Sequence, residues 1–168
     1  MRKTIDRVRL SASAACVVGL VVGAAAALGL SSEGSAAQTR IERRAIRPGT
    51  GPNTGLPYSP GILAGDTLYI SGHLGQDPAA RRVVPGGIEA ETRQIMTYIR
   101  GVLEEAGMTF EDVVSVNAYL TNLEEFPRFN EVYRTYFPKD PPARTTVGVA
   151  SLNIGARVEL TMTAVKRR

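Results

Sequence analysis

The 168-residue sequence has one cysteine, one histidine and no tryptophan. The cysteine, Cys16, lies in an apolar segment near the N-terminus. If that segment is removed, the remaining chain can form no disulfide and has no cysteine nucleophile. A classical zinc or iron site needs several imidazole or thiolate ligands, which the single histidine, His73, does not supply. The sequence therefore predicts a domain that is stabilised by an apolar core and holds no metal.

The sequence also lacks a basic surface of the kind that binds nucleic acid. Its formal net charge is +4, but the excess of positive over negative charge comes from residues 2–9 and from the tail, residues 166–168. No basic stripe interleaved with aromatic side chains lies between them. We therefore expect no nucleic-acid partner.

The first forty residues differ in composition from the rest of the chain. A basic start is followed by an uncharged run, residues 12–30, and then by small polar residues with Ser35 and Ala37 at the spacing of a cleavage site. This pattern predicts a signal peptide, residues 1–37, and one domain, residues 38–168, that is periplasmic or secreted. The alternative is an uncleaved membrane anchor formed by residues 12–30, whose length is close to that of a spanning helix.

The remaining residues alternate between strand and helix patterns. Period-two alternation and helical spacing predict strands over residues 41–46, 67–71 and 110–120, helices over 87–107 and 126–137, and a final strand pair over 141–149 and 156–165. Pro138 closes the second helix. This order predicts an α+β fold with both helices on one face of a mixed sheet. We expect oligomerisation to cover the other face.

The final strand pair carries an arginine and a glutamate. Residues 151–155 read as the turn of an antiparallel pair, which would put Arg144 and Glu159 on neighbouring strands. Charged side chains in a half-buried strand are costly unless they point to solvent, to each other or to a ligand. From these residues alone, a solvated cross-strand ion pair and a ligand site both remain open.

Two loop positions suggest a site. Residues 47–60 are too rich in glycine and proline for regular structure, and Tyr58 favours a functional loop over a disordered one. The strand over residues 67–71 ends at Gly72, where the absence of a side chain lets the backbone approach another group closely. The adjacent His73 is more typical of a structural or surface residue than of a catalytic base.

Five short pieces together resemble the Rid family of reactive-intermediate deaminases, the RidA/YjgF proteins. They are Tyr58-Ser59, Ser71-Gly72, Asn130 within residues 129–133, Pro142-Ala143-Arg144 and Val158-Glu159-Leu160. The resemblance covers residues 41–168 and implies a chorismate-mutase-like homotrimer, with a mixed six-stranded sheet and two helices on one face of each subunit. It also implies hydrolysis of small 2-imino acids, or enamines such as 2-aminoacrylate, to 2-oxo acids and ammonia without any cofactor.

The resemblance also implies roles for single residues. Arg144 would bind the substrate carboxylate, and Glu159 would order or deprotonate the attacking water. The substrate-binding cleft would further be lined by Tyr58, Gly72, Asn130 and Thr146. Thr146 stands where many members have cysteine, and His73 where many have glutamine, so we expect an altered pocket. A second hypothesis is a non-catalytic trimer that binds ligands or acts as a chaperone through the same cleft, but the presence of both Arg144 and Glu159 favours an enzyme.

Overall fold

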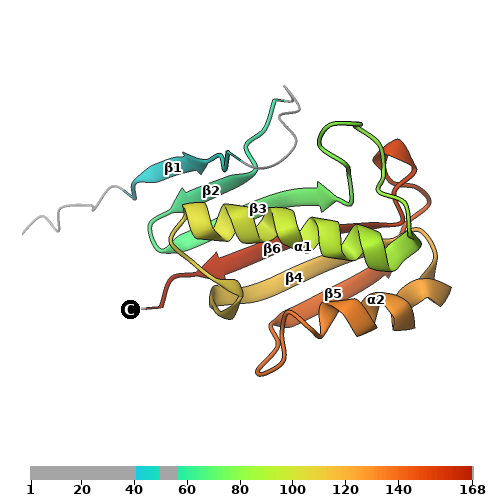
Figure 1. Ribbon diagram of the computed structural model, residues 1–168. Coiled ribbons are helices and arrows are strands. Elements are labelled where there is room, and N and C mark those ends of the chain that lie inside the picture. Colours follow the sequence, from blue (N-terminus) through green and yellow to red (C-terminus); the bar gives the residue numbers. More distant parts are fainter. Residues whose placement is uncertain (1–40, 50–56, 168) are drawn as a thin grey trace, which may run out of the picture. The chain divides into compact units, whose positions relative to one another are not determined.

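Six strands form one mixed sheet in the order β1-β2-β3-β6-β4-β5 in the computed structural model, which describes residues 41–49 and 57–167 (Figure 1). The strands are β1 Arg43–Ile46, β2 Gly61–Ala64, β3 Thr67–Leu74, β4 Val113–Leu120, β5 Ala143–Gly148 and β6 Val158–Val165. All neighbouring strands are antiparallel except β4 and β5, which run parallel. The predicted signal peptide and the alternative anchor lie outside the described residues.

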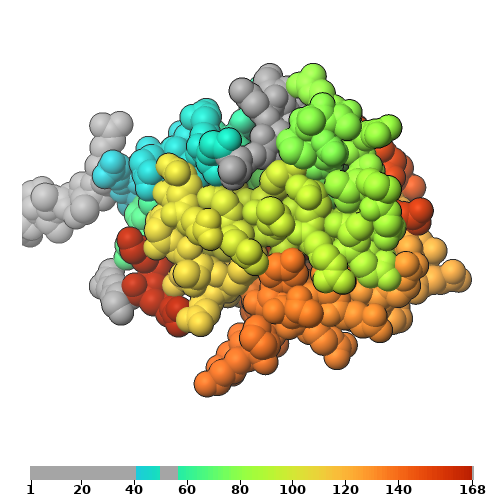
Figure 2. All heavy atoms as spheres, viewed as in Figure 1, coloured from blue at the N-terminus to red at the C-terminus, as the bar shows by residue number. Residues whose placement is uncertain are grey.

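Two helices lie on the same side of this sheet, as the sequence predicts (Figure 1). Helix α1 spans Gly87–Glu105 and helix α2 spans Phe126–Tyr133. Figure 2 shows that α1, in yellow and green, and the orange segment around α2 lie side by side on this face. Within the part of the chain that the structure describes, no helix is long and apolar enough to cross a membrane.

The hydrophobic core lies between the helices and the sheet. On β6, Val158, Leu160, Met162 and Ala164 are all buried, and they alternate with residues that face away from the helices. The apolar positions of β4 and β6 are therefore covered by the chain's own helices. The opposite face of these two strands is largely polar, and there Asn117 Nδ2 donates to Thr161 Oγ1 at 3.3 Å. The apolar alternation of β4 and β6 therefore serves the core of the single chain.

The predicted antiparallel pairing of β5 with β6 is wrong, because β4 lies between these two strands. Strand β5 follows β4 through α2 and pairs with it in parallel, and β6 then inserts antiparallel between β3 and β4. The segment between β5 and β6 is a crossover over β4 rather than a tight turn. A run of polar residues between two strands does not encode which strands pair.

Several elements differ from the prediction. Residues 110–112 form a 3-10 turn that Thr109 caps, so the strand predicted from residue 110 begins at Val113. Helix α2 ends at Tyr133, four residues earlier than predicted, because tighter turns follow, with Thr135 N donating to Val132 O at 3.1 Å. The short strand β2 was not distinguished in the sequence. These differences leave the arrangement of layers unchanged.

Candidate functional site

Arg144 lies at the edge of the sheet on the side that faces the helices. It pairs with Val116 of β4, whose side chain is buried in the core, and paired residues point to the same face. Its Nη2 donates to Asn130 Oδ1 on α2 at 2.7 Å. The neutral amide of Asn130 therefore fixes one corner of the guanidinium without neutralising its charge. Thr146 pairs with the buried Ala118, so it lies on the same face, two residues further along β5.

Three aromatic rings of α2 surround the same guanidinium. We call them the aromatic cradle; their ring centroids lie 5.5, 5.2 and 4.4 Å from Arg144 Cζ for Phe126, Phe129 and Tyr133, respectively. Aromatic faces attract a cation because of their electron-rich π-systems. Burial raises the pKa of Tyr133 to about 12, and the positive charge of Arg144 opposes this rise. Tyr133 therefore stays a neutral phenol beside the arginine.

Glu159 lies on the other face of the sheet. It is the second residue of β6, between the buried Val158 and Leu160, and it pairs with Leu74 and Tyr119 on the two adjacent strands. A β-carbon at Gly72 would overlap Glu159 Oε1 and lie 2.9 Å from Cδ, so the carboxyl group rests on the glycine backbone. Burial raises the pKa of Glu159. No hydrogen bond or ion pair within residues 41–49 and 57–167 engages this carboxylate.

The segment that carries Tyr58 is tied to β3 at Ser71, where the register of β3 with β6 is irregular. Ser71 Oγ donates to Ser59 O at 2.7 Å, and Ser71 N donates to Pro60 O at 3.0 Å. These bonds bring the segment alongside Ser71 and Gly72, while the Tyr58 side chain stays half exposed. Gly72 lies against Glu159, and the tied segment brings the backbone next to Tyr58 to the same part of β3; we call Tyr58, Gly72 and Glu159 the glutamate half-site.

The arginine half-site, which consists of Asn130, Arg144 and Thr146, does not meet the glutamate half-site within one chain. The two half-sites lie on opposite faces of the sheet, and strand β4 separates Arg144 from Glu159. The predicted placement of Arg144 and Glu159 on neighbouring strands is therefore wrong. The cross-strand ion pair that the sequence left open is excluded for the same reason.

His73 points away from the glutamate half-site. It pairs with the buried Leu160, and its ring centroid lies 6.1 Å from that of Tyr98 on α1, so it lies on the helix side of the sheet. Burial lowers the pKa of His73 to about 4, against the opposing effect of the Pro60 carbonyl. The ring is therefore neutral at physiological pH and lies beneath α1.

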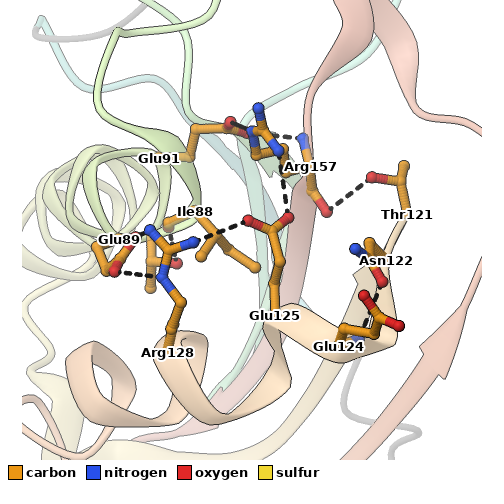
Figure 3. A network of polar contacts seen from close by, with 10 residues as sticks. Ile88, Glu89, Glu91, Thr121, Asn122, Glu124, Glu125, Arg128 and Arg157 are labelled. Atoms are coloured by element: carbon orange, nitrogen blue, oxygen red, sulfur yellow. Dashed lines mark hydrogen bonds and ion pairs between the residues drawn. The ribbon is translucent and has the colours of Figure 1, made fainter.

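A network of charged residues anchors the start of β6, close to Glu159 (Figure 3). Glu91 of α1 is 1% exposed, and its Oε2 accepts a hydrogen bond from the backbone N–H of Arg157 at 2.8 Å. Burial raises the pKa of Glu91, and the backbone N–H and the guanidinium of Arg157 oppose this rise. The Arg157 Nη1 also lies 3.4 Å from Oε2 of Glu125. The network therefore fixes the backbone two residues before Glu159.

The same network joins the two helices at their N-terminal ends. Arg128 of α2 forms a two-point contact with Glu89 of α1, in which Nε–Oε1 and Nη2–Oε2 are both 2.7 Å. Arg128 Nη1 also lies 3.4 Å from Oε1 of Glu125. Glu125 thus bridges Arg128 and Arg157 (Figure 3). These contacts hold α2, which carries Asn130 and the aromatic cradle, in a fixed position against α1.

A surface cavity contains none of the predicted site residues. The cavity of about 270 Å³ is lined by Phe110, Glu111, Val113, Tyr136, Phe137, Pro138, Lys139, Asp140 and Arg167. The described residues include no group of three or more histidine, cysteine, aspartate or glutamate side chains that could hold a metal ion.

Comparison with known proteins identifies the family. Residues 49–166 match the family described as Endoribonuclease L-PSP. The chain belongs to this family. A solved Rid-family protein from Yersinia pestis has the same fold, with a TM-score of 0.71 at 33% identity over 74% of this chain and all of that chain. The predicted membership of the Rid family and the predicted sheet with two helices are both confirmed.

Two relatives of this Rid-family chain show how far the similarity extends. A goat (Capra hircus) protein named 2-iminobutanoate/2-iminopropanoate deaminase is 41% identical over 126 residues, which cover 75% of this chain and 92% of the relative. A RutC family protein of Saccharolobus solfataricus is 44% identical over 110 residues, or 66% of this chain and 87% of the relative. Both relatives match over nearly their whole length.

Sequence reasoning missed one feature of the candidate site, the aromatic cradle around Arg144. In the sequence, its three rings fit the apolar stripe of the helix predicted over residues 126–137, which does not indicate a site. Phe126, Phe129, Asn130 and Tyr133 are spaced by three and four residues, so they share one face of α2. A polar asparagine is unusual among aromatic residues on the core-facing side of a helix. This signal could have predicted that Asn130 and the three rings contact one polar group, which the structure shows to be Arg144.

Proposed function

We propose that this Rid-family chain hydrolyses small 2-imino acids, and enamines such as 2-aminoacrylate after tautomerisation, to 2-oxo acids and ammonia. The proposal rests on one observation: the guanidinium of Arg144 and the carboxylate of Glu159 each lack a partner of opposite charge within the part of the chain that the structure describes. Among the described residues, Arg144 has no carboxylate partner and Glu159 has no cationic one. Relatives that are 36–41% identical and named 2-iminobutanoate/2-iminopropanoate deaminase support the same reaction.

Arg144 would bind the carboxylate that every 2-imino acid carries. A guanidinium offers five N–H donors in a planar fork, and two parallel N–H donors match the two oxygens of a carboxylate. Asn130 accepts a hydrogen bond from only one nitrogen of Arg144, so other donors remain for a ligand. Binding the carboxylate in this way would fix the position of the imine carbon.

Glu159 would act on the attacking water. The carboxylate accepts a proton from water as the oxygen bonds to the imine carbon, and the C=N double bond becomes a C–N single bond. The proton then passes to the nitrogen, which gives a carbinolamine. The hydroxyl proton of the carbinolamine follows to the nitrogen as the C–N bond breaks, so ammonia leaves and a C=O double bond forms. The sum is one 2-imino acid and one water to one 2-oxo acid and one ammonia. A glutamate whose pKa is raised by burial is a better base near neutral pH than an ordinary one.

A complete site on this proposal needs more than one copy of the chain. The arginine half-site lies at the edge strand β5, and the glutamate half-site lies on the face that the helices leave uncovered. We propose a homotrimer in which the arginine half-site of one subunit faces the glutamate half-site of the next. Closed cyclic symmetry would then create one cleft per interface.

The direct test is ammonia release from enzymatically generated 2-iminopropionate by the purified chain. A second experiment tests the shared cleft. Arg144→Lys and Glu159→Gln chains are each expected to be nearly inactive, but subunit exchange in an equal mixture would unite an intact Arg144 with an intact Glu159 at about one quarter of the sites. Activity of the mixture at that level supports the proposal.

Other results would contradict the proposal in distinct ways. If Arg144→Lys and Glu159→Gln are each inactive and their mixture stays inactive after subunit exchange, the proposed site between subunits is refuted. A folded chain that binds 2-oxobutanoate but releases no ammonia faster than the uncatalysed reaction would refute the deaminase and leave the ligand-binding alternative.

We also propose that residues 1–37 are removed on export, so that the domain acts in the periplasm or outside the cell. The sequence pattern at Ser35 and Ala37 supports this proposal. Mass spectrometry of the native protein is expected to find a chain that starts at Gln38. An intact Met1 in the membrane fraction would instead favour an anchor.

A further inference from the structure

Arg144 is held only by groups that leave its charge intact. Its polar contact is the neutral amide of Asn130, and its other neighbours are the rings of the aromatic cradle. A carboxylate in this position would neutralise the guanidinium and compete with a substrate carboxylate. Aromatic faces orient a cation without such competition, because they carry no net charge.

Tyr133 makes the closest of the ring contacts. Its centroid lies 4.4 Å from Arg144 Cζ, against 5.2 Å for Phe129. The Tyr133 side chain is itself locked, because it is 6% exposed and its ring lies between those of Phe129, at 5.5 Å, and Phe137, at 4.8 Å. The ring therefore offers the guanidinium a rigid surface.

We propose that Tyr133 is a positioning residue, whose ring holds the guanidinium of Arg144 in the orientation that binds the substrate carboxylate. This inference rests on the proposed function. The ring acts through Arg144 and does not touch the substrate. The Tyr133 hydroxyl is buried without a hydrogen bond of ordinary geometry among the described residues, but it lies close enough to Arg144 for the guanidinium to oppose the rise of its pKa. The role of the ring therefore has to be separated from that of the hydroxyl by experiment.

The test compares variants that separate the ring from the hydroxyl and from general packing. Tyr133→Phe keeps the ring, and Tyr133→Met fills similar space without an aromatic face. Tyr133→Leu is a second variant without the ring, should the methionine variant fail to assemble. Tyr136→Leu is the matched control, because Tyr136 also lies beside an arginine, Arg100, at 5.9 Å, but does not contact Arg144.

The measured quantities are the affinity for 2-oxobutanoate by calorimetry, kcat and KM for imine hydrolysis, and the melting temperature. We expect Tyr133→Met to weaken 2-oxobutanoate binding about tenfold, and Tyr133→Phe and Tyr136→Leu to leave it within about threefold. Because Tyr133 acts through Arg144, adding Tyr133→Met to Arg144→Lys should cause no further loss of affinity.

Each contrary result has a separate meaning. If Tyr133→Met lowers the melting temperature but the folded protein binds 2-oxobutanoate like the parent, Tyr133 is only a core residue and the inference fails. Equal losses in Tyr133→Phe and Tyr133→Met would refute the role of the ring. If Arg144→Lys itself leaves the affinity unchanged, the carboxylate-binding role of Arg144 fails, and with it the proposed function.

Discussion

The carboxyl group of Glu159 occupies the space that a side chain at Gly72 would need. A β-carbon on Gly72 would overlap Glu159 Oε1 and lie 2.9 Å from Cδ. The two residues lie on adjacent strands, at the irregular register where β3 meets β6. The glycine is therefore required by the position of the carboxylate rather than by a turn.

Gly72→Ala should separate activity from stability. The atoms that the new methyl group meets belong to the end of a flexible side chain, so Glu159 can move aside and the free energy of unfolding should fall by less than about 1 kcal/mol. Displacement of the carboxylate by about 1 Å should lower kcat for imine hydrolysis about a hundredfold. Thermal melts and initial rates on the same preparation measure both effects.

Gly75→Ala serves as the contrasting control. A β-carbon there would lie 2.6 Å from Cβ and 2.8 Å from the backbone oxygen of Glu91, and these atoms belong to a helix and cannot move aside. We expect a loss of stability of several kcal/mol, on the scale of severe overpacking. A Gly72→Ala variant as unstable as Gly75→Ala would contradict our account of Gly72.

Arg144→Lys keeps the positive charge but loses the planar fork. A bidentate carboxylate contact contributes on the order of 2–4 kcal/mol, so kcat/KM should fall at least about a hundredfold. The change should also weaken binding of 2-oxobutanoate. Parental kinetics in a well-folded Arg144→Lys protein would end the assignment of Arg144 as the carboxylate-binding residue.

Glu159→Gln should lower turnover and leave binding largely intact. The amide keeps the shape of the side chain but cannot accept the proton, so kcat should fall about a hundredfold or more while 2-oxobutanoate still binds. In the parent, burial raises the pKa of Glu159 above the ordinary 4.5. As the pH is lowered, Glu159 should therefore become protonated, and activity should be lost, at a higher pH than for an exposed glutamate. A pH profile of kcat/KM without this decline would argue against Glu159 as the base.

The sequence was sufficient for most of the fold, because the elements carry strong periodic patterns. Helix α1 has buried residues at helical spacing and stops before Gly107, which has a φ of 71°. The pairing of β5 could not be predicted in the same way. Proximity along the chain favours a hairpin with β6, whereas the parallel pairing with β4 depends on how α2 packs.

The residue types of the site could be predicted, but their arrangement could not. Glu159 lies between two apolar residues, Val158 and Leu160, so its outward direction follows from alternation. The residues around Arg144 on β5 are mostly small or polar, and no apolar alternation marks its face. The opposite orientation of the two residues therefore emerges only from the register of β4 with both neighbouring strands.

His73 should make stability depend on pH. Burial lowers its pKa from 6.5 to about 4 in the folded state, so the unfolded chain binds more protons between these values and stability falls as the pH falls through this window. The shift corresponds to about 3 kcal/mol. His73→Gln should remove this component. Urea titrations at pH 7 and pH 4.5, at one protein concentration, measure the free energy of unfolding of the parent and of His73→Gln. If His73 were solvated, this free energy would depend on pH equally in the two proteins.

Ile154→Gly should stabilise the domain, because Ile154 has a backbone conformation that β-branched residues avoid. Its φ is 54°, and the residue is 40% exposed, so the loss of its partly buried side chain offsets part of the gain. Relief of the left-handed strain should exceed the combined cost of the lost burial and of the added freedom of glycine in the unfolded chain, and raise the free energy of unfolding by less than about 1 kcal/mol. The matched control is Gly155→Ala, where φ is 72° and a β-carbon would meet no atom within 4 Å. It adds the same strain without a clash, so it should destabilise the domain by a similar amount. Changes of the same sign in the two variants would show that the backbone conformation of this segment does not determine its energy.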